Sequence, residues 1–178
     1  MRTTAYAALA AATALIGLGS ATAAEASPAP ADTSRAVAAV KEKGIVLECT
    51  GKADGLSAYV NLYENDTYSN YVQVILDDDP ELAKSREPAD ILDQGRIRTG
   101  VRIAGKPARV VGTAVRYGAR KHVHEEYDDA GQHIVADGFH RRLGYELVLR
   151  YDGTAVPLRC APAFYYSLNV TKTDITGD

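Results

Sequence analysis

Tryptophan is absent from the 178-residue chain, methionine occurs once, and phenylalanine and cysteine each occur twice. A chain without tryptophan lacks the buried tryptophan that packs against the disulfide of immunoglobulin-type domains. Internal repeats, a Gly-x-Ser-x-Gly nucleophile elbow and a phosphate-binding glycine loop are also absent. The sequence therefore has none of the motifs of repeat proteins, α/β-hydrolases or nucleotide-binding folds. These absences exclude function classes without indicating a function.

Long hydrophobic runs are confined to the N-terminus. An Ala/Leu-rich run extends to Gly19 and is followed by Ala21-Thr22-Ala23, which is the pattern of a secretory signal peptide with a small-residue cleavage site. The run is too short, and has the wrong flanks, for a lasting membrane span. We expect a secreted, extracellular protein with three parts: a signal peptide at residues 1–24, a flexible linker at residues 25–31 and a single β-domain at residues 32–178.

The two cysteines, Cys49 and Cys160, are 111 positions apart. In an oxidising extracellular compartment they most simply form one disulfide bond. Closing a loop of that length stabilises the folded state by about 4–5 kcal/mol in the chain-entropy model. The bridge would join the first strand of the domain to nearly the last, which suits a sheet whose ends meet.

β-rich runs separated by regularly spaced turn signals predict roughly 8–9 strands. The clearest turn is Asp152-Gly153, a pair typical of a two-residue type I′ hairpin, because both turn residues need positive φ. Asp32-Thr33-Ser34 is a typical helix N-cap and Gly44 a typical helix end, so a short helix is expected over residues 35–43. The predicted fold class is all-β: an antiparallel β-barrel, with a β-sandwich as the alternative, and one short N-terminal helix.

All four histidines lie within residues 122–140. Residues 128–131 have the composition of a four-residue hairpin loop, which would pair position 127 with position 132. In this register His122 lies opposite Asp137, and His124 lies opposite Val135. Residues two apart on a strand share a face, so one face of the hairpin is expected to carry His122, His124, His133 and Asp137.

Two histidines at i and i+2, with a third from the neighbouring strand, can hold one zinc ion and leave a position for water. The His-x-His strand resembles the metal strand of cupins and of carbonic-anhydrase-type sites, which implies a metal site at His122, His124, His133 and Asp137. The other face of the hairpin carries Val123, Ile134 and Ala136 and is expected to be the core side. We therefore favour a solvated histidine face without a cofactor, and keep zinc as the alternative.

The net charge of −3 conceals two runs of opposite charge. Residues 64–93 contain nine acids and two bases, and residues 94–121 contain eight bases and no acid. Neighbouring strands are expected to neutralise each other, and the alternative is a basic sheet face for an acidic partner. Nucleic-acid binding is not expected, because the basic run lacks interleaved aromatic residues.

Tyrosine occurs eleven times and is favoured at binding surfaces, because it joins an apolar ring to a polar tip. Two tyrosines are expected to face each other at the tip of the hairpin that residues 57–63 form with residues 68–76. The candidate binding-surface residues are Tyr63, Tyr68, Arg96, Arg98 and Arg102.

A secreted, disulfide-stapled β-module without catalytic residues on its core side is expected to be a non-enzymatic binding or inhibitor-like protein. Its partner would be an unknown extracellular protein or envelope component. One alternative is a barrel that carries a small ligand in its lumen. The other is a metal-binding protein or a metal-dependent enzyme that uses the hairpin of residues 122–140.

Overall fold

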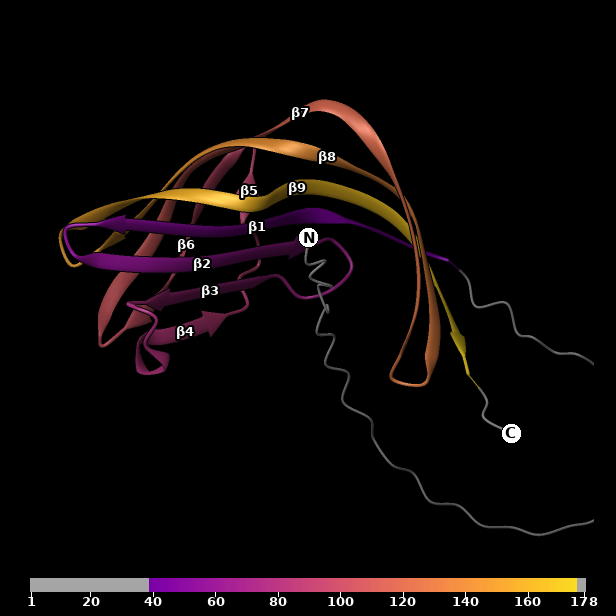
Figure 1. Ribbon diagram of the computed structural model, residues 1–178, viewed down its shortest axis with the longest axis horizontal. Helices are drawn as coiled ribbons and strands as arrows, with labels where there is room; N and C mark the ends of the chain where they lie inside the picture. Colours follow the sequence, from indigo (N-terminus) through magenta and orange to yellow (C-terminus); the bar gives the residue numbers. More distant parts are fainter. Residues whose placement is uncertain (1–38, 176–178) are drawn as a thin grey trace, which may run out of the picture. The chain divides into compact units, whose positions relative to one another are not determined.

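The computed structural model describes residues 39–175, which form one antiparallel sheet of nine strands in the order β4-β3-β2-β1-β9-β8-β7-β6-β5 (Figure 1). The strands are β1 (Val40–Ala53), β2 (Leu56–Asn65), β3 (Tyr71–Leu76), β4 (Ala83–Arg86), β5 (Leu92–Asp93), β6 (Arg96–Ile103), β7 (Lys106–Asp129), β8 (Gln132–Tyr151) and β9 (Thr154–Asp174). A 3-10 turn, η1 (Pro80–Leu82), precedes β4. The predicted all-β antiparallel class is confirmed.

The first and last strands of the described chain pair in the middle of the sheet. β1 lies between β2 and β9, so the chain folds as two sets of hairpins that meet along β1 and β9. Cys49 lies directly opposite Cys160 in this pairing, and the two form a disulfide bond. The predicted disulfide is therefore confirmed, and it links neighbouring strands at the centre of the sheet.

Five hairpins close on two-residue turns in which both residues have positive φ. The turn Asp152-Gly153 has φ values of 48° and 84° and pairs Tyr151 with Thr154, as predicted. The other four turns have the same form: Asp54-Gly55, Gln94-Gly95, Ala104-Gly105 and Ala130-Gly131. Such turns match the right-handed twist of the strands that they join, which favours the long hairpins of this sheet.

One face of the sheet forms the core, and alternate residues along much of each strand point into it. In β8 and β9, Leu149 lies opposite Val156 and Leu147 opposite Leu158, and all four side chains are buried. In β3, Val72, Val74 and Leu76 point inward, and the residues between them are only half-buried. The largest fully buried side chains are Ile45, Leu47, Leu62, Leu76, Ile97, Ile103 and Leu149.

The sheet curls until its two outer parts approach each other, but backbone hydrogen bonds do not close it. In Figure 1, β5 and β6 pass behind β1 to β4. Side chains bridge the gap: Arg86 donates to the carbonyl oxygen of Gly100 and, at 3.1 Å, to the hydroxyl oxygen of Thr99. Glu64 Oε2 accepts from the backbone N–H groups of Ile91 and Leu92, each at 2.8 Å. The described residues thus form an open, curled sheet, and the predicted barrel closure is not observed.

The helix predicted for residues 35–43 is wrong where the structure describes it. Val40–Lys43 belong to β1 and pair with β9, for example Val40 with Val170. Cross-strand pairing outweighs the weak helical preference of this short segment. Residues 35–38, the signal peptide and the linker lie outside the described residues. Among residues 39–175, no helix is long and apolar enough to cross a membrane.

β7, β8 and β9 are long, continuous strands of 24, 20 and 21 residues. Each strand bends at an irregularity in its pairing, in β7 between Tyr117 and Lys121 and in β8 between Arg142 and Leu147. Gly118, with φ of 74°, lies at the bend of β7. Beyond the bends the strands turn away from the core and run downward at the right of Figure 1. We call this part the arm and define it as residues 121–129, 132–140, 166–174 and 40–43.

Candidate functional site

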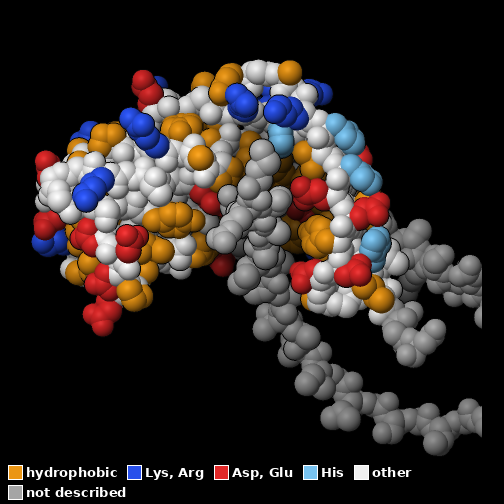
Figure 2. Space-filling model, in the orientation of Figure 1, with side chains coloured by type: hydrophobic (Ala, Val, Ile, Leu, Met, Phe, Trp, Pro, Cys, Tyr) orange, Lys and Arg blue, Asp and Glu red, His pale blue; other side chains and the backbone are white. Residues whose placement is uncertain are grey.

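The histidine side chains follow the outer edge of the arm (Figure 2). The turn Ala130-Gly131 is two residues long instead of four, so Asp129 pairs with Gln132 and the register moves by two residues. His124 therefore lies opposite Asp137, and His122 opposite Phe139. The predicted cross-strand pairs are wrong. A shift of two preserves the face, so His122, His124, His133 and Asp137 do share one face.

His124 lies between two carboxylates. Its Nδ1 is 3.1 Å from Asp137 Oδ2, and its Nε2 is 3.0 Å from Glu126 Oε1. Hydrogen bonds to Asp137 first, and then to Glu126, raise the pKa of His124 above its usual 6.5, because both carboxylates favour the imidazolium. His122 Nε2 is 3.3 Å from the same Asp137 oxygen.

These contacts use the ring nitrogens that a metal ion would need. Both nitrogens of His124 face carboxylates, and His133 Nδ1 is 2.8 Å from Asp128 Oδ1, away from the other two histidines. The side chain of His122 is 71% exposed. In the part of the chain that the structure describes, no group of three or more His, Cys, Asp or Glu side chains is placed to hold a metal ion. The zinc site stays a prediction that would require these side chains to move.

A second feature lies on the outward face of β6, β7 and β8. The predicted binding residues Arg96, Arg98 and Arg102 alternate with buried residues along β6, so all three are exposed on the same face. We call the following set the arginine face: Arg96, Arg98, Arg102, Arg109 and Arg150. Arg109 and Arg150, from β7 and β8, lie directly opposite each other.

The arginine face is not neutralised from within the described residues. Among residues 39–175, none of its five arginines has an acidic side chain within ion-pair distance. The ion pairs that lysines form there, Lys43 with Asp66 and Lys106 with Asp152, do not involve this face. Like charges directly opposite on a sheet destabilise it, and Arg109 faces Arg150. An anion bound between them would relieve this repulsion. The expectation that neighbouring strands neutralise each other does not describe this face.

Gly100 lies in the middle of the arginine face and carries no side chain. It lies opposite Arg109 and, along β6, between Arg98 and Arg102. A Cβ atom at Gly100 would overlap the carbonyl oxygen of Ala108, because the two backbones approach closely here. Only glycine fits this position, so the arginine face has no side chain between Arg98 and Arg102 on β6. Sequence reasoning missed Arg109 and Arg150, whose placement depends on the register of β6, β7 and β8.

The two candidate tyrosines do not face each other, contrary to the prediction. Tyr63 pairs with Tyr71, and its ring stacks on that of Tyr166 with the centroids 6.3 Å apart. Its hydroxyl oxygen accepts from Asn65 Nδ2 at 2.8 Å and from the Tyr166 hydroxyl at 3.1 Å. Tyr68 is 50% exposed in the loop between β2 and β3. Tyr63 thus has a packing role. Of the two candidates, Tyr68 is the exposed one, with Lys172 Nζ 5.4 Å from the centroid of its ring.

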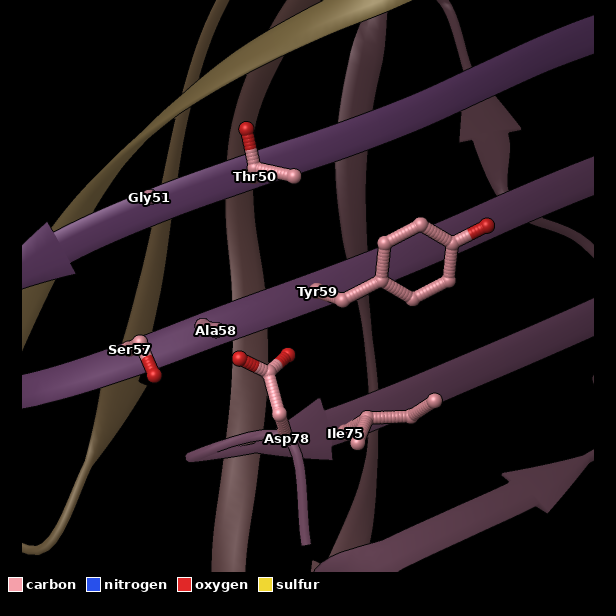
Figure 3. A pocket seen from close by; sticks show the side chains of 7 residues that line it. All are labelled: Thr50, Gly51, Ser57, Ala58, Tyr59, Ile75 and Asp78. Carbon is pink, nitrogen blue, oxygen red and sulfur yellow. The ribbon is translucent and has the colours of Figure 1, made fainter.

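A shallow depression of about 390 Å³ lies on the outer face of β1, β2 and β3 (Figure 3). Its lining residues are Thr50, Gly51, Ser57, Ala58, Tyr59, Ile75 and Asp78. Tyr59 and Ile75 lie opposite each other on β2 and β3, and burial raises the pKa of Tyr59 above 10. The depression is open to solvent, and no pair of its side chains forms an acid–base or nucleophilic arrangement.

Comparison with known proteins gives no match for this chain: no family model, no curated protein and no solved structure is similar to it. The function is therefore inferred from the geometry of the described residues.

Proposed function

We propose that this chain is a secreted, non-enzymatic β-module that binds an acidic extracellular protein through the arginine face. The observation that carries the proposal is the direct opposition of Arg109 and Arg150 beside Arg98 and Arg102, with no acidic side chain of residues 39–175 in ion-pair contact with any of them. Arginine binds carboxylates with two parallel hydrogen bonds. A row of carboxylates on a partner would therefore match this face in both charge and geometry.

Charge segregation supports an electrostatic mode of binding. The whole chain carries a net charge of −3, yet the arginine face concentrates five positive charges on three adjacent strands. A concentrated patch of one sign steers a partner of opposite charge and raises its association rate. Binding by this face is accordingly fast and sensitive to salt.

The composition of the face favours a protein over a nucleic acid. Between the arginines lie Val111 and Val148, which face each other on β7 and β8 and are half-buried. Single-stranded nucleic acids require aromatic side chains on which bases can stack, and this part of the face carries valine. Aliphatic side chains beside arginines suit a protein surface that combines apolar and acidic groups.

A packed interior distinguishes this proposal from the alternative of a small-ligand carrier. Leu47, Leu62 and Leu149 are fully buried between the facing parts of the curled sheet. A ligand in the lumen would have to displace such side chains, at a cost of several kcal/mol. No observation on the described residues favours the carrier.

The test uses retention of the mature, oxidised protein on immobilised poly-L-glutamate in a salt gradient. The wild type is expected to bind, because its positive charges are segregated, and Arg98→Gln/Arg109→Gln is expected to elute at clearly lower salt. The matched control is Lys52→Gln/Lys84→Gln, which removes two exposed charges outside the arginine face. Equal elution of the two double variants, or no retention of the wild type, would overturn the proposal.

A further inference from the structure

The outer edge of β7 is open along the arm. β6 pairs with β7 only as far as Thr113, and Ala114 N–H donates to the carbonyl oxygen of Gly95. From Val115 to Asp129, within the described residues, β7 pairs with β8 alone. Alternate residues of an antiparallel strand direct their N–H and C=O groups to opposite sides. Every second residue of this run thus carries backbone groups that no other described strand binds.

This edge is also uncovered. Residues 115–129 are all exposed except Val123, which is half-buried. Three large apolar side chains stand on the run with high exposure, Val115 at 58%, Tyr117 at 48% and Tyr127 at 45%. A long exposed edge with unpaired backbone groups is a template for another strand. The chemistry of the edge then decides which strand fits.

The charges along the edge change sign in the middle. Its first half carries the bases Arg116, Arg120 and Lys121, and its second half carries the acids Glu125, Glu126, Asp128 and Asp129. Figure 2 shows basic side chains at the bend, and histidine and acidic side chains together further down the arm. An antiparallel strand of the same sequence places its acidic half beside the basic half of the first. The edge is therefore complementary to itself.

Symmetry restricts the possible registers. A two-fold axis perpendicular to the sheet keeps each face on its own side, so a residue can lie opposite only residues of its own face. With the axis at Val123, Lys121 lies opposite Glu125 of the second copy, and Arg120 lies opposite Glu126 of the second copy. Moving the axis to His122 places Lys121 opposite Val123 and loses these pairs. The register centred on Val123 thus places four pairs of opposite charge across the dimer interface. To form its pair, Arg120 must turn away from the Phe139 ring, over which its guanidinium lies at 4.4 Å from the centroid.

We propose that a second copy of this chain docks antiparallel along β7, with the two-fold axis at Val123, and continues the sheet through both copies. The interface is formed by residues 119–127 of each copy and is separate from the arginine face on β6, β7 and β8. Charged residues on an edge usually prevent pairing with unrelated strands. Here they also select the partner, because only a strand with the reverse order of charges matches them.

Charge reversal tests the register. The wild type is expected to sediment as a dimer at low ionic strength, and both Lys121→Glu and Glu125→Lys are expected to weaken dimerisation at least tenfold. The double variant Lys121→Glu/Glu125→Lys should dimerise as the wild type does, and an equimolar mixture of the single variants should form a heterodimer. Lys52→Glu, an exposed charge outside the interface, is the control and should dimerise normally. A monomeric wild type, or single variants that dimerise unchanged, would overturn the proposal.

Crosslinking provides a second measurement that does not depend on charge. At the axis, Val123 lies opposite Val123 of the second copy, and side chains of a directly opposed pair are close enough for a disulfide. Val123→Cys is therefore expected to form covalent dimers under mild oxidation. Tyr127→Cys is the matched control on the same edge, because it would face Ala119 of the second copy and should stay uncrosslinked. Equal crosslinking of the two variants would contradict the register even if the charge variants failed to fold.

Discussion

At the scale of single residues, the histidine face is a set of ion pairs with a defined pH response. Asp137 contacts both His122 and His124, and Glu126 contacts His124 from the other side. The raised pKa of His124 means that folding favours its protonated form. The contribution of His124 to stability is therefore fully present below 6.5, the pKa of the unfolded chain, and is lost as the pH rises through the higher pKa of the folded protein.

The pKa of His124 is expected to depend on Asp137. Because the hydrogen bond to Asp137 is the largest cause of the shift, Asp137→Asn should lower the pKa of His124 toward 6.5. The measurement is an NMR titration of the histidine ring protons. Asp128→Asn, which removes the partner of His133, is the control and should leave His124 unchanged. A wild-type His124 that titrates at or below 6.5 would contradict this assignment.

At the scale of the elements, the close spacing of β7 and β8 depends on Gly112. Gly112 lies opposite Leu147 with φ of 151°, and a Cβ atom there would overlap the carbonyl oxygen of Glu146. A side chain at this position would push the two strands apart in the middle of the sheet. The core side chains on both strands, such as Val110 and Leu149, would then lose packing contacts.

Gly112→Ala is expected to destabilise the protein by about 2 kcal/mol or more, as overpacking in a tightly packed site does. Urea denaturation of the oxidised protein measures the change. Thr113→Ala, at the exposed neighbouring position, is the matched control and should stay within about 0.5 kcal/mol of the wild type. If both variants unfolded at the same urea concentration, the close approach of β7 and β8 would not limit this position.

Most strands could be predicted from the sequence, because period-two alternation and Asp-Gly turns are local signals. The turn Ala130-Gly131 could not be, since Ala130 adopts φ of 49° and alanine gives no sign of a left-handed conformation. The acids before it suggested a longer loop. The real register differs from the predicted one by two residues. The histidines therefore lie on the predicted face, but every cross-strand pair on that face is different, and Asp137 was not predicted as the residue opposite His124.

The arginine face was only half predictable for a different reason. Arg96, Arg98 and Arg102 alternate on one strand, so their common face follows from the sequence. The opposition of Arg109 and Arg150 depends on the register of the hairpin between β7 and β8. The local turn signals in the sequence do not predict this register. Long-range pairing with β9 also explains why residues 40–43 form the start of β1 and not the predicted helix.

At the scale of the whole molecule, the disulfide joins two strands that lie far apart in the sequence. Cys49 and Cys160 are 111 residues apart in sequence, and the side chains of both are buried. A crosslink across so long a loop removes many conformations from the unfolded chain. Its effect is therefore expected in the free energy of unfolding of the entire sheet.

Reduction, or the double substitution Cys49→Ala/Cys160→Ala, is expected to lower the free energy of unfolding by about 4 kcal/mol. The comparison of urea midpoints for the oxidised, reduced and substituted proteins measures the loss. The reduced and substituted proteins should agree closely, which separates the crosslink from the small change in packing. Equal midpoints for the oxidised and reduced forms would contradict the expectation.

The position of β1 between β2 and β9 also determines when the sheet can be completed. A chain made from its N-terminus can form the hairpins of β1 to β4 early, but one edge of β1 stays open until β9, the last strand, is present. Until then the core side chains of β1, such as Ile45 and Leu47, lack the neighbouring side chains that β9 contributes to the core. Pairing between segments so distant in sequence is slow. We therefore expect the strands β1 to β4 and β5 to β8 to form two half-sheets before β9 joins them.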